Sequence, residues 1–106
     1  MTKIVNLTPH AINITGGPTF APSGEVARVE QNVVRARDIN GIPVHGVSFG
    51  DIVGLPNLTD DTFFIVSAIV LAASKAVGRK DCIAPNSGDA VRNQAGHIVS
   101  VNGFVM

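Results

Sequence analysis

The polar residues best suited to hold a ligand lie in the last third of the chain. A basic turn at 79–81 is followed by the polar run 85–94, which contains Asn86, Arg92 and Asn93. A guanidinium donates two parallel hydrogen bonds and an amide both donates and accepts, so this composition suits the capture of a phosphate or a purine edge. A solvated loop with ordinary turn residues explains the same composition, and the residues alone do not decide between the two.

Other reactive side chains are scattered along the sequence. His10, His45 and His97 share no helical spacing, and the lone Cys82 has no second cysteine with which to build a thiolate metal site. The adjacent acids 60–61 point in different directions on any regular element, and turn chemistry explains both. We therefore expect no catalytic residues, no metal and no cofactor. Cys82 is expected to be a small buried hydrophobic residue.

A central strand that leads directly into a helix is predicted around Ser67. Residues 62–67 hold Phe63 and Phe64 in a continuous β-branched and aromatic run, and Ser67 suits a helix N-cap before a short helix over 68–77. The free N–H groups at such a helix start favour anions. One phenylalanine beside it can stack on a base, although a phenylalanine in this kind of run usually packs in the core.

The remaining sequence predicts short strands separated by turns. Strands are expected on both sides of a turn at 8–10, in a hairpin-like segment around 19–21, from residue 25, at 42–47, at 82–84 and at 97–101. Asn40-Gly41 signals a type I′ hairpin turn. Residues 49–56 are expected to form an irregular strand or a bulge. The expected fold class is α+β, mainly antiparallel β-sheet with one principal short helix. Residues 1–106 are expected to form one small single domain.

Composition limits the partners. Charged residues make up only 15% of the chain, against a usual share of roughly 25%, and eight basic residues balance eight acidic ones with no block of like charge. This excludes the electrostatic footprint of a DNA- or RNA-polymer-binding protein or of a protein bound to an anionic membrane. The expected helix is apolar around nearly its whole circumference, which predicts burial on more than one side. We therefore expect a homo-oligomer, a dimer or higher.

The sequence also predicts a cytoplasmic protein. A single cysteine fits a reducing compartment, and the first residues lack the apolar run of a signal peptide. The longest apolar stretch, 63–73, falls well short of the ~20 residues that a membrane span needs.

Segments along almost the whole chain together resemble a set of small bacteriophage and prophage proteins. They are Asn6-Leu7-Thr8-Pro9-His10, Pro22-Ser23-Gly24 to Ala27-Arg28-Val29, Phe49-Gly50 to Gly54-Leu55-Pro56, and the tail from Arg79-Lys80-Asp81 through Val91-Arg92-Asn93 to Ile98-Val99. The layout resembles the Thoeris anti-defence sponges, phage proteins that sequester the cyclic ADP-ribose signals of bacterial immunity. The resemblance implies a ligand site shared by two subunits, with an aromatic side chain stacked on adenine and C-terminal arginines on the phosphates.

Carried over by position, the resemblance gives the stacking role to Phe64 or its neighbour Phe63, and the first arginine role to Arg92. Where a second arginine is expected, this chain has His97. Proximity and composition add polar contacts from Asn86 and Asn93.

The function that follows is binding and sequestration of a cyclic nucleotide signal, a cyclic ADP-ribose isomer or a related cyclic oligonucleotide, without cleavage, in the host bacterial cytoplasm. A different class stays open, in which the chain is a phage structural or accessory protein with only protein partners. In a third class, a hydrolase of the same signal, one of the scattered histidines would act as general base.

Overall fold

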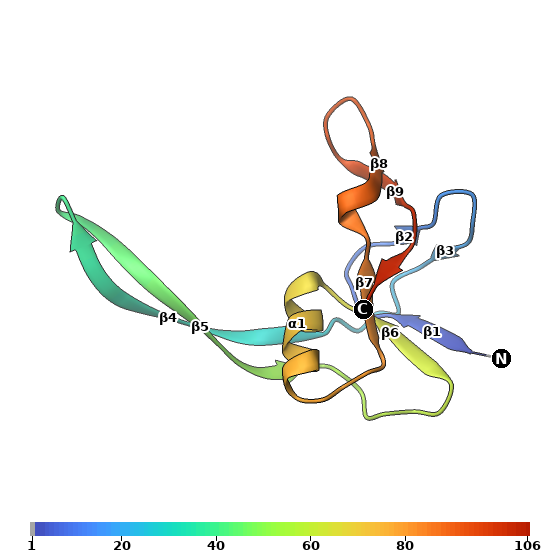
Figure 1. Cartoon of the computed structure of the whole chain (residues 1–106), viewed down its shortest axis with the longest axis horizontal. Helices are drawn as coiled ribbons and strands as arrows, with labels where there is room; N and C mark the ends of the chain where they lie inside the picture. Colours follow the sequence, from blue (N-terminus) through green and yellow to red (C-terminus); the bar gives the residue numbers. More distant parts are fainter. Residues whose placement is uncertain (1) are drawn as a thin grey trace.

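The centre of the fold is a four-stranded sheet in the order β1-β6-β7-β10, with the helix α1 joining β6 to β7 (Figure 1). The computed structural model describes residues 2–106, so Met1, the first residue of the expected domain, lies outside the described residues. The pairs β1–β6 and β6–β7 are parallel, and β7–β10 is antiparallel. The other three sheets of the described chain are antiparallel strand pairs, which confirms the α+β class with mainly antiparallel strands and one principal helix.

The bounds of the elements are β1 Lys3–Asn6, β2 Ile12–Asn13, β3 Thr19–Phe20, β4 Arg28–Ile39, β5 Ile42–Val53, β6 Thr62–Ile65, α1 Ala68–Ala76, β7 Cys82–Pro85, the 3-10 turn η1 Ser87–Asp89, β8 Ala90–Arg92, β9 Ile98–Val101 and β10 Phe104–Val105. The short strands expected at 82–84 and 97–101 are therefore confirmed to within a residue. The strands β8 and β10 were not expected from the sequence, because each has fewer than four residues and carries no alternating pattern of its own.

The core lies between the central sheet and α1. Strand alternation sends Phe64 and Val66 to the same side of the sheet, where they join Val70 of the helix and Cys82 and Ala84 of β7. Burying side chains of this size stabilises the fold by about 1.5–3 kcal/mol each for the larger ones. The run of β-branched and aromatic residues thus forms the central strand that the sequence predicts, with β1 on one side and β7 on the other.

The helix begins and ends where the sequence predicts. The Ser67 hydroxyl accepts a hydrogen bond from the Val70 amide at 3.3 Å, and Gly78 follows the helix with a φ of 82°. Within one chain the sheet covers one face of α1, burying Val70 and Ser74, while Ile69 stays 55% exposed. Burial of α1 on more than one side therefore stays a prediction that requires a second subunit. Among residues 2–106, no helix has the length and apolar character needed to cross a membrane.

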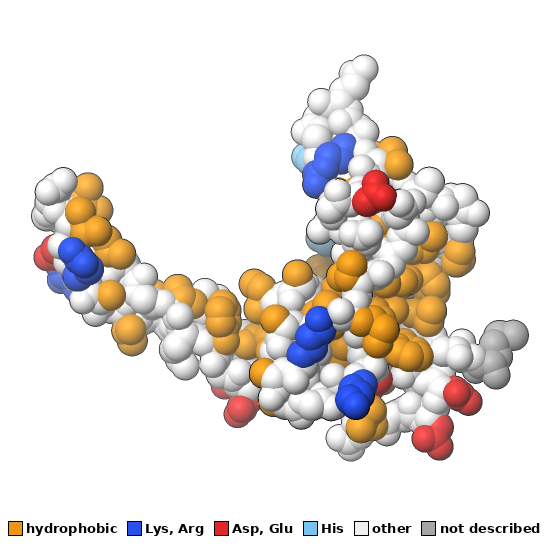
Figure 2. All heavy atoms as spheres, in the orientation of Figure 1, with side chains coloured by type: hydrophobic (Ala, Val, Ile, Leu, Met, Phe, Trp, Pro, Cys, Tyr) orange, Lys and Arg blue, Asp and Glu red, His pale blue; other side chains and the backbone are white. Residues whose placement is uncertain are grey.

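The most extended feature is the arm, the β4–β5 hairpin, which projects away from the rest of the molecule (Figures 1 and 2). Asn40 and Gly41 at its tip have φ values of 50° and 79°, as the predicted type I′ turn requires. The returning strand extends to Val53 rather than ending at residue 47, and a bulge interrupts it near Gly50. The arm raises the radius of gyration to 16.4 Å, against about 13 Å for an ordinary domain of this length.

Gly54 fixes the direction in which the arm leaves the body. Its φ is 83°, and a Cβ there would lie 2.6 Å from the Val26 carbonyl oxygen. We expect Gly54→Ala to lower the free energy of unfolding by at least about 2 kcal/mol, since strain and overlap add. Gly16→Ala is the control, because Gly16 has a φ of 70° but no atom within 4 Å of its added Cβ, and should cost about 1 kcal/mol. Equal losses in urea unfolding would show that the contact with Val26 does not constrain Gly54.

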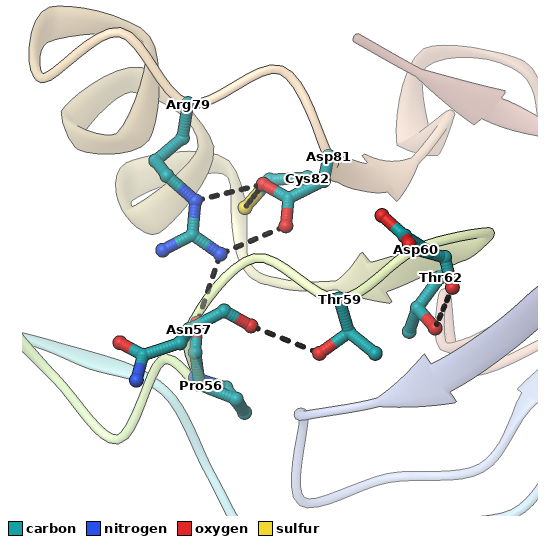
Figure 3. A network of polar contacts seen from close by, with 8 residues as sticks. All are labelled: Pro56, Asn57, Thr59, Asp60, Thr62, Arg79, Asp81 and Cys82. Atoms are coloured by element: carbon teal, nitrogen blue, oxygen red, sulfur yellow. Dashed lines mark hydrogen bonds and ion pairs between the residues drawn. The ribbon is translucent and has the colours of Figure 1, made fainter.

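An ion pair fastens the connection that follows the arm to the start of β7 (Figure 3). Arg79 donates to both carboxylate oxygens of Asp81, at 2.9 and 2.8 Å, and also to the Pro56 carbonyl at 2.9 Å. These hydrogen bonds from Arg79 hold the pKa of Asp81 below its ordinary value. The neighbouring Cys82 is buried, which raises the pKa of its thiol and confirms the expected role as a core residue.

Candidate functional site

A hollow opens where the carboxyl ends of three parallel strands meet. His10 follows β1, Ala68 begins the helix after β6, and Pro85 and Ser87 end and follow β7. Ligands of sheets with parallel strands bind at this edge, because the loops that leave the strands converge there. We call this cavity the carboxyl-end hollow. It has a volume of about 350 Å³ and is lined by His10, Ala11, Ile12, Asn13, Ala68, Pro85, Ser87, Ile98, Val99, Ser100 and Val101.

The far wall of the hollow is built by β2 and β9, which are fastened to each other. The Thr15 amide donates to the Val101 carbonyl at 2.8 Å, and the Asn13 side chain donates to the Val99 carbonyl at 3.0 Å. The hydroxyls of Thr15 and Ser100 lie 2.8 Å apart within hydrogen-bonding distance. Residues more than 80 positions apart in the sequence therefore form one continuous wall.

Buried Asn6 fixes the turn that carries His10. Its amide nitrogen donates to the carbonyls of His10, at 2.8 Å, and Phe20, at 3.0 Å. Its amide oxygen accepts from the backbone and hydroxyl of Thr8, at 2.9 and 2.7 Å. Because one side chain satisfies four hydrogen bonds at once, the segment after β1 has one well-defined path to the wall of the hollow.

The lining of the hollow combines apolar surface with a few polar groups. Ile98 and Val99 supply aliphatic wall, while His10 and Ser87 supply donors and acceptors at the rim. The hollow lies at the small end of the 300–1,000 Å³ range of small-molecule sites. Ala68, the first residue of α1, brings the positive end of the helix dipole to the same place. This arrangement suits a ligand with a flat apolar surface and an anionic edge.

Three of the residues predicted from the sequence come together on the C-terminal hairpin, formed by β8 and β9. Arg92 pairs in register with Ile98, a residue of the hollow wall, and its guanidinium donates to the Gly96 carbonyl at 2.9 Å. The Asn93 side-chain oxygen accepts from the amides of Ala95 and His97, both at 3.0 Å. Asn93 therefore shapes the turn, whereas Arg92 and His97 are exposed on the hairpin that borders the hollow.

None of the other predicted residues lines the hollow. Asn86 is half-buried beside Ser87, and its backbone N–H donates to the Gly103 carbonyl at 2.9 Å. Phe64 is only 3% exposed within the core, so a stacking role for Phe64 conflicts with its burial and is withdrawn. Phe63 is half-buried on β6 and does not line the hollow. Within one chain, the structure therefore separates the aromatic candidates from Arg92.

Sequence reasoning missed the polar lining residues His10, Asn13, Ser87 and Ser100. The only local signal was the turn after the first strand, which shows that His10 follows a strand end but not which other strand ends lie beside it. Across residues 2–106, no group of three or more His, Cys, Asp or Glu side chains is placed to hold a metal ion.

No protein-family model matches the chain, and no curated protein or solved structure matches it. The resemblance to the anti-defence sponges therefore rests on the sequence segments quoted above.

Proposed function

We propose that this protein binds a small cyclic nucleotide signal in the carboxyl-end hollow and holds it without altering it. The observation that carries the proposal is the position of the hollow, at the joint carboxyl ends of β1, β6 and β7 and at the start of α1. A nucleotide combines a flat apolar base with hydrogen-bonding edges and negative phosphates. The lining, the helix start and the neighbouring Arg92 offer a partner for each of these parts.

The ligand is placed by the chemistry of the walls. The base lies against Ile98 and Val99, and its edges reach the polar groups of His10 and Ser100. The phosphates lie toward α1 and Arg92, where charge-assisted hydrogen bonds are strongest. Phe63 joins this site only from a second subunit, as the resemblance to sponges with a shared site implies.

The biological role that we propose is immune evasion by a phage, in the cytoplasm of its bacterial host. A protein that binds a cyclic ADP-ribose isomer or a related cyclic oligonucleotide at micromolar or better affinity lowers the free concentration of that signal without enzymatic turnover.

Uptake and release test the proposal. Purified protein is mixed with a panel of cyclic nucleotides, separated from free ligand and heat-denatured, and the released material is analysed by mass spectrometry. We expect one nucleotide to be retained and released intact. An altered product would indicate an enzyme, and no uptake from the panel would contradict the proposal.

A pair of variants of α1 shows whether any uptake takes place in the hollow. Ala68→Glu puts a carboxylate at the start of the helix, where it favours the helix dipole but repels an anionic ligand, so uptake should fall. Ala72→Glu adds the same charge at an exposed position of α1 outside the hollow and should leave uptake unchanged. Equal uptake by both variants would place the ligand elsewhere.

The arm favours a second candidate function, a phage structural or accessory protein with only protein partners. Two strands of 12 residues reach far from the body and expose apolar side chains on both faces. A stable assembly that takes up no nucleotide would support this function over sequestration.

A further inference from the structure

The arm exposes apolar side chains that its own chain leaves uncovered. Val34 is 60% exposed and Ile42 is 65% exposed, and an orange stripe follows the arm to its tip in Figure 2. An isolated two-stranded ribbon is marginally stable at best, and apolar patches of this extent mark interaction surfaces. The exposed large apolar residues of the arm are Val33, Val34, Ile39, Ile42, Val44, Val47, Phe49 and Val53.

The two edges of the arm are poorly suited to pairing with another strand. Pro43 cannot donate a backbone hydrogen bond from β5, and the register shifts near Gly50 in β5 and at Ala36 in β4. Proline and bulges at an edge disfavour the addition of another strand. The faces of the ribbon, rather than its edges, are therefore the surfaces available to a partner.

Charges are segregated along one face of the arm. Val34 and Arg37 lie opposite Gly46 and Val44, which are two residues apart in β5 and therefore share a face. Glu30 is four residues before Val34 in β4, and the extra residue of the bulge opposite it belongs to β5, so the alternation of β4 places Glu30 on that face too. By the same alternation, Arg28, which is two residues before Glu30, and Asp51, which is two residues before Val53, the partner of Arg28, also lie on this face. The face thus carries two acids and one arginine near the root, a valine beside a glycine in the middle and a single arginine toward the tip.

We propose that this face packs against the same face of a second copy of the chain, with the two arms antiparallel and each tip beside the other's root. In this arrangement Arg37 meets the partner's Glu30 and Glu30 meets the partner's Arg37, because a two-fold axis near Val34 exchanges the two ends. Gly46 has no side chain and leaves room for the partner's Val34. Two copies of this face therefore bring Arg37 and Glu30 together only when the two arms are antiparallel.

One face of the arm provides a contact of modest size. The two strands have 12 residues each and send about half of their side chains to this face, fewer than the 20–30 residues per side of a standard interface. Ile39 and Ile42 at the tip would lie near the partner's root, where Val53 is 52% exposed, so apolar surface is covered at both ends. The inference goes beyond the proposed function, since it assigns the dimer contact and does not depend on what the hollow binds.

Charge reversal tests the arrangement in the full chain by sedimentation at low salt. Wild type should be a dimer, and Arg37→Glu and Glu30→Arg should each weaken dimerisation roughly 10-fold or more, because each puts like charges together twice. The double variant should recover the wild-type dissociation constant to within about 3-fold. A monomeric wild type, single variants that dimerise normally, or a double variant without recovery would each overturn the proposal.

Cross-linking gives a second readout that does not depend on charge. Val34→Cys should be cross-linked into a dimer by a short bismaleimide, because the two-fold axis near Val34 brings the two copies of this position to within about the 10 Å that separates packed sheets. Leu58→Cys is the control, since Leu58 is 69% exposed but lies outside the arm. Equal cross-linking of both variants, or none at position 34, would overturn the antiparallel arrangement even if the chain is dimeric.

Discussion

Replacing Asp81 with asparagine is expected to lower the free energy of unfolding by about 3 kcal/mol or more. The carboxylate is 9% exposed and accepts two hydrogen bonds from Arg79, whose guanidinium is itself only 18% exposed. Removing one partner of a buried pair leaves the other charge without compensation, which typically costs about 3–5 kcal/mol. The loss would also loosen the hold of Arg79 on the Pro56 carbonyl. Equilibrium unfolding in urea measures the effect.

Asp38→Asn is the matched control, because Asp38 forms the same kind of pair with Arg35 on the exposed arm. Exposed pairs contribute little, so this variant should stay within about 1 kcal/mol of wild type. Equal losses for the two variants would contradict the structural role of the Arg79–Asp81 pair.

Lowering the pH should reveal how much the Asp81 carboxylate contributes to the stability of wild type. Since the folded-state pKa of Asp81 is lowered, its contribution to stability is complete above the unfolded pKa of about 3.9 and is lost as pH falls through the lower folded-state pKa. Wild type should therefore lose more stability than Asp81→Asn when the pH is lowered from 5 to 2. An identical decline in both proteins would show that Asp81 does not carry this pH dependence.

Arg92→Ala is expected to weaken binding of the cyclic nucleotide by roughly 30-fold or more, with the fold intact. Arg92 borders the hollow through its pairing with Ile98, and the loss of a charge-assisted partner of a phosphate costs ~2–5 kcal/mol. The side chain is exposed and its only hydrogen bond within residues 2–106 is to the Gly96 carbonyl, so the fold should tolerate its removal. Calorimetric titration of wild type and variant measures the ratio of affinities.

Lys75→Ala serves as the control for charge. It also removes one exposed positive charge, but from the last turn of α1, at the end of the helix away from the hollow. We expect its affinity to stay within about 3-fold of wild type, since exposed charges at this distance are largely screened. An Arg92→Ala variant that binds as well as Lys75→Ala would remove Arg92 from the site.

Local features of the fold could be predicted where a few neighbouring residues determine the geometry. Asn40-Gly41 adopts the two positive φ values of its turn, and Ser67 caps the helix that begins after it. Each of these depends on side-chain and backbone chemistry within four residues. The bulge at Gly50 and Asp51 confirms the irregular strand or bulge expected at 49–56. The strand expected at 42–47 continues through this bulge to Val53, because the partner strand runs on beside it.

The hollow could not be predicted, because it depends on which strands lie side by side. β1 and β6 are more than 50 residues apart, and the parallel pairing of β1, β6 and β7 gathers the residues that follow them at one edge. The choice between Phe63 and Phe64 likewise depended on which face of the strand α1 covers. The share of helix burial that one chain provides could not be predicted, because an apolar residue such as Ile69 gives no sign of whether its partner belongs to the same chain or to another.

The most direct test of ligand binding in the carboxyl-end hollow is an NMR titration of the 15N-labelled protein with the retained cyclic nucleotide. The proposed function predicts that the largest amide shift changes occur at Ala11, Asn13, Ala68 and Ser100, which line the hollow, and saturate with increasing ligand. Smaller changes should follow on the C-terminal hairpin near Arg92. Saturating changes confined to other surfaces, or unchanged spectra at millimolar nucleotide, would contradict binding in the hollow.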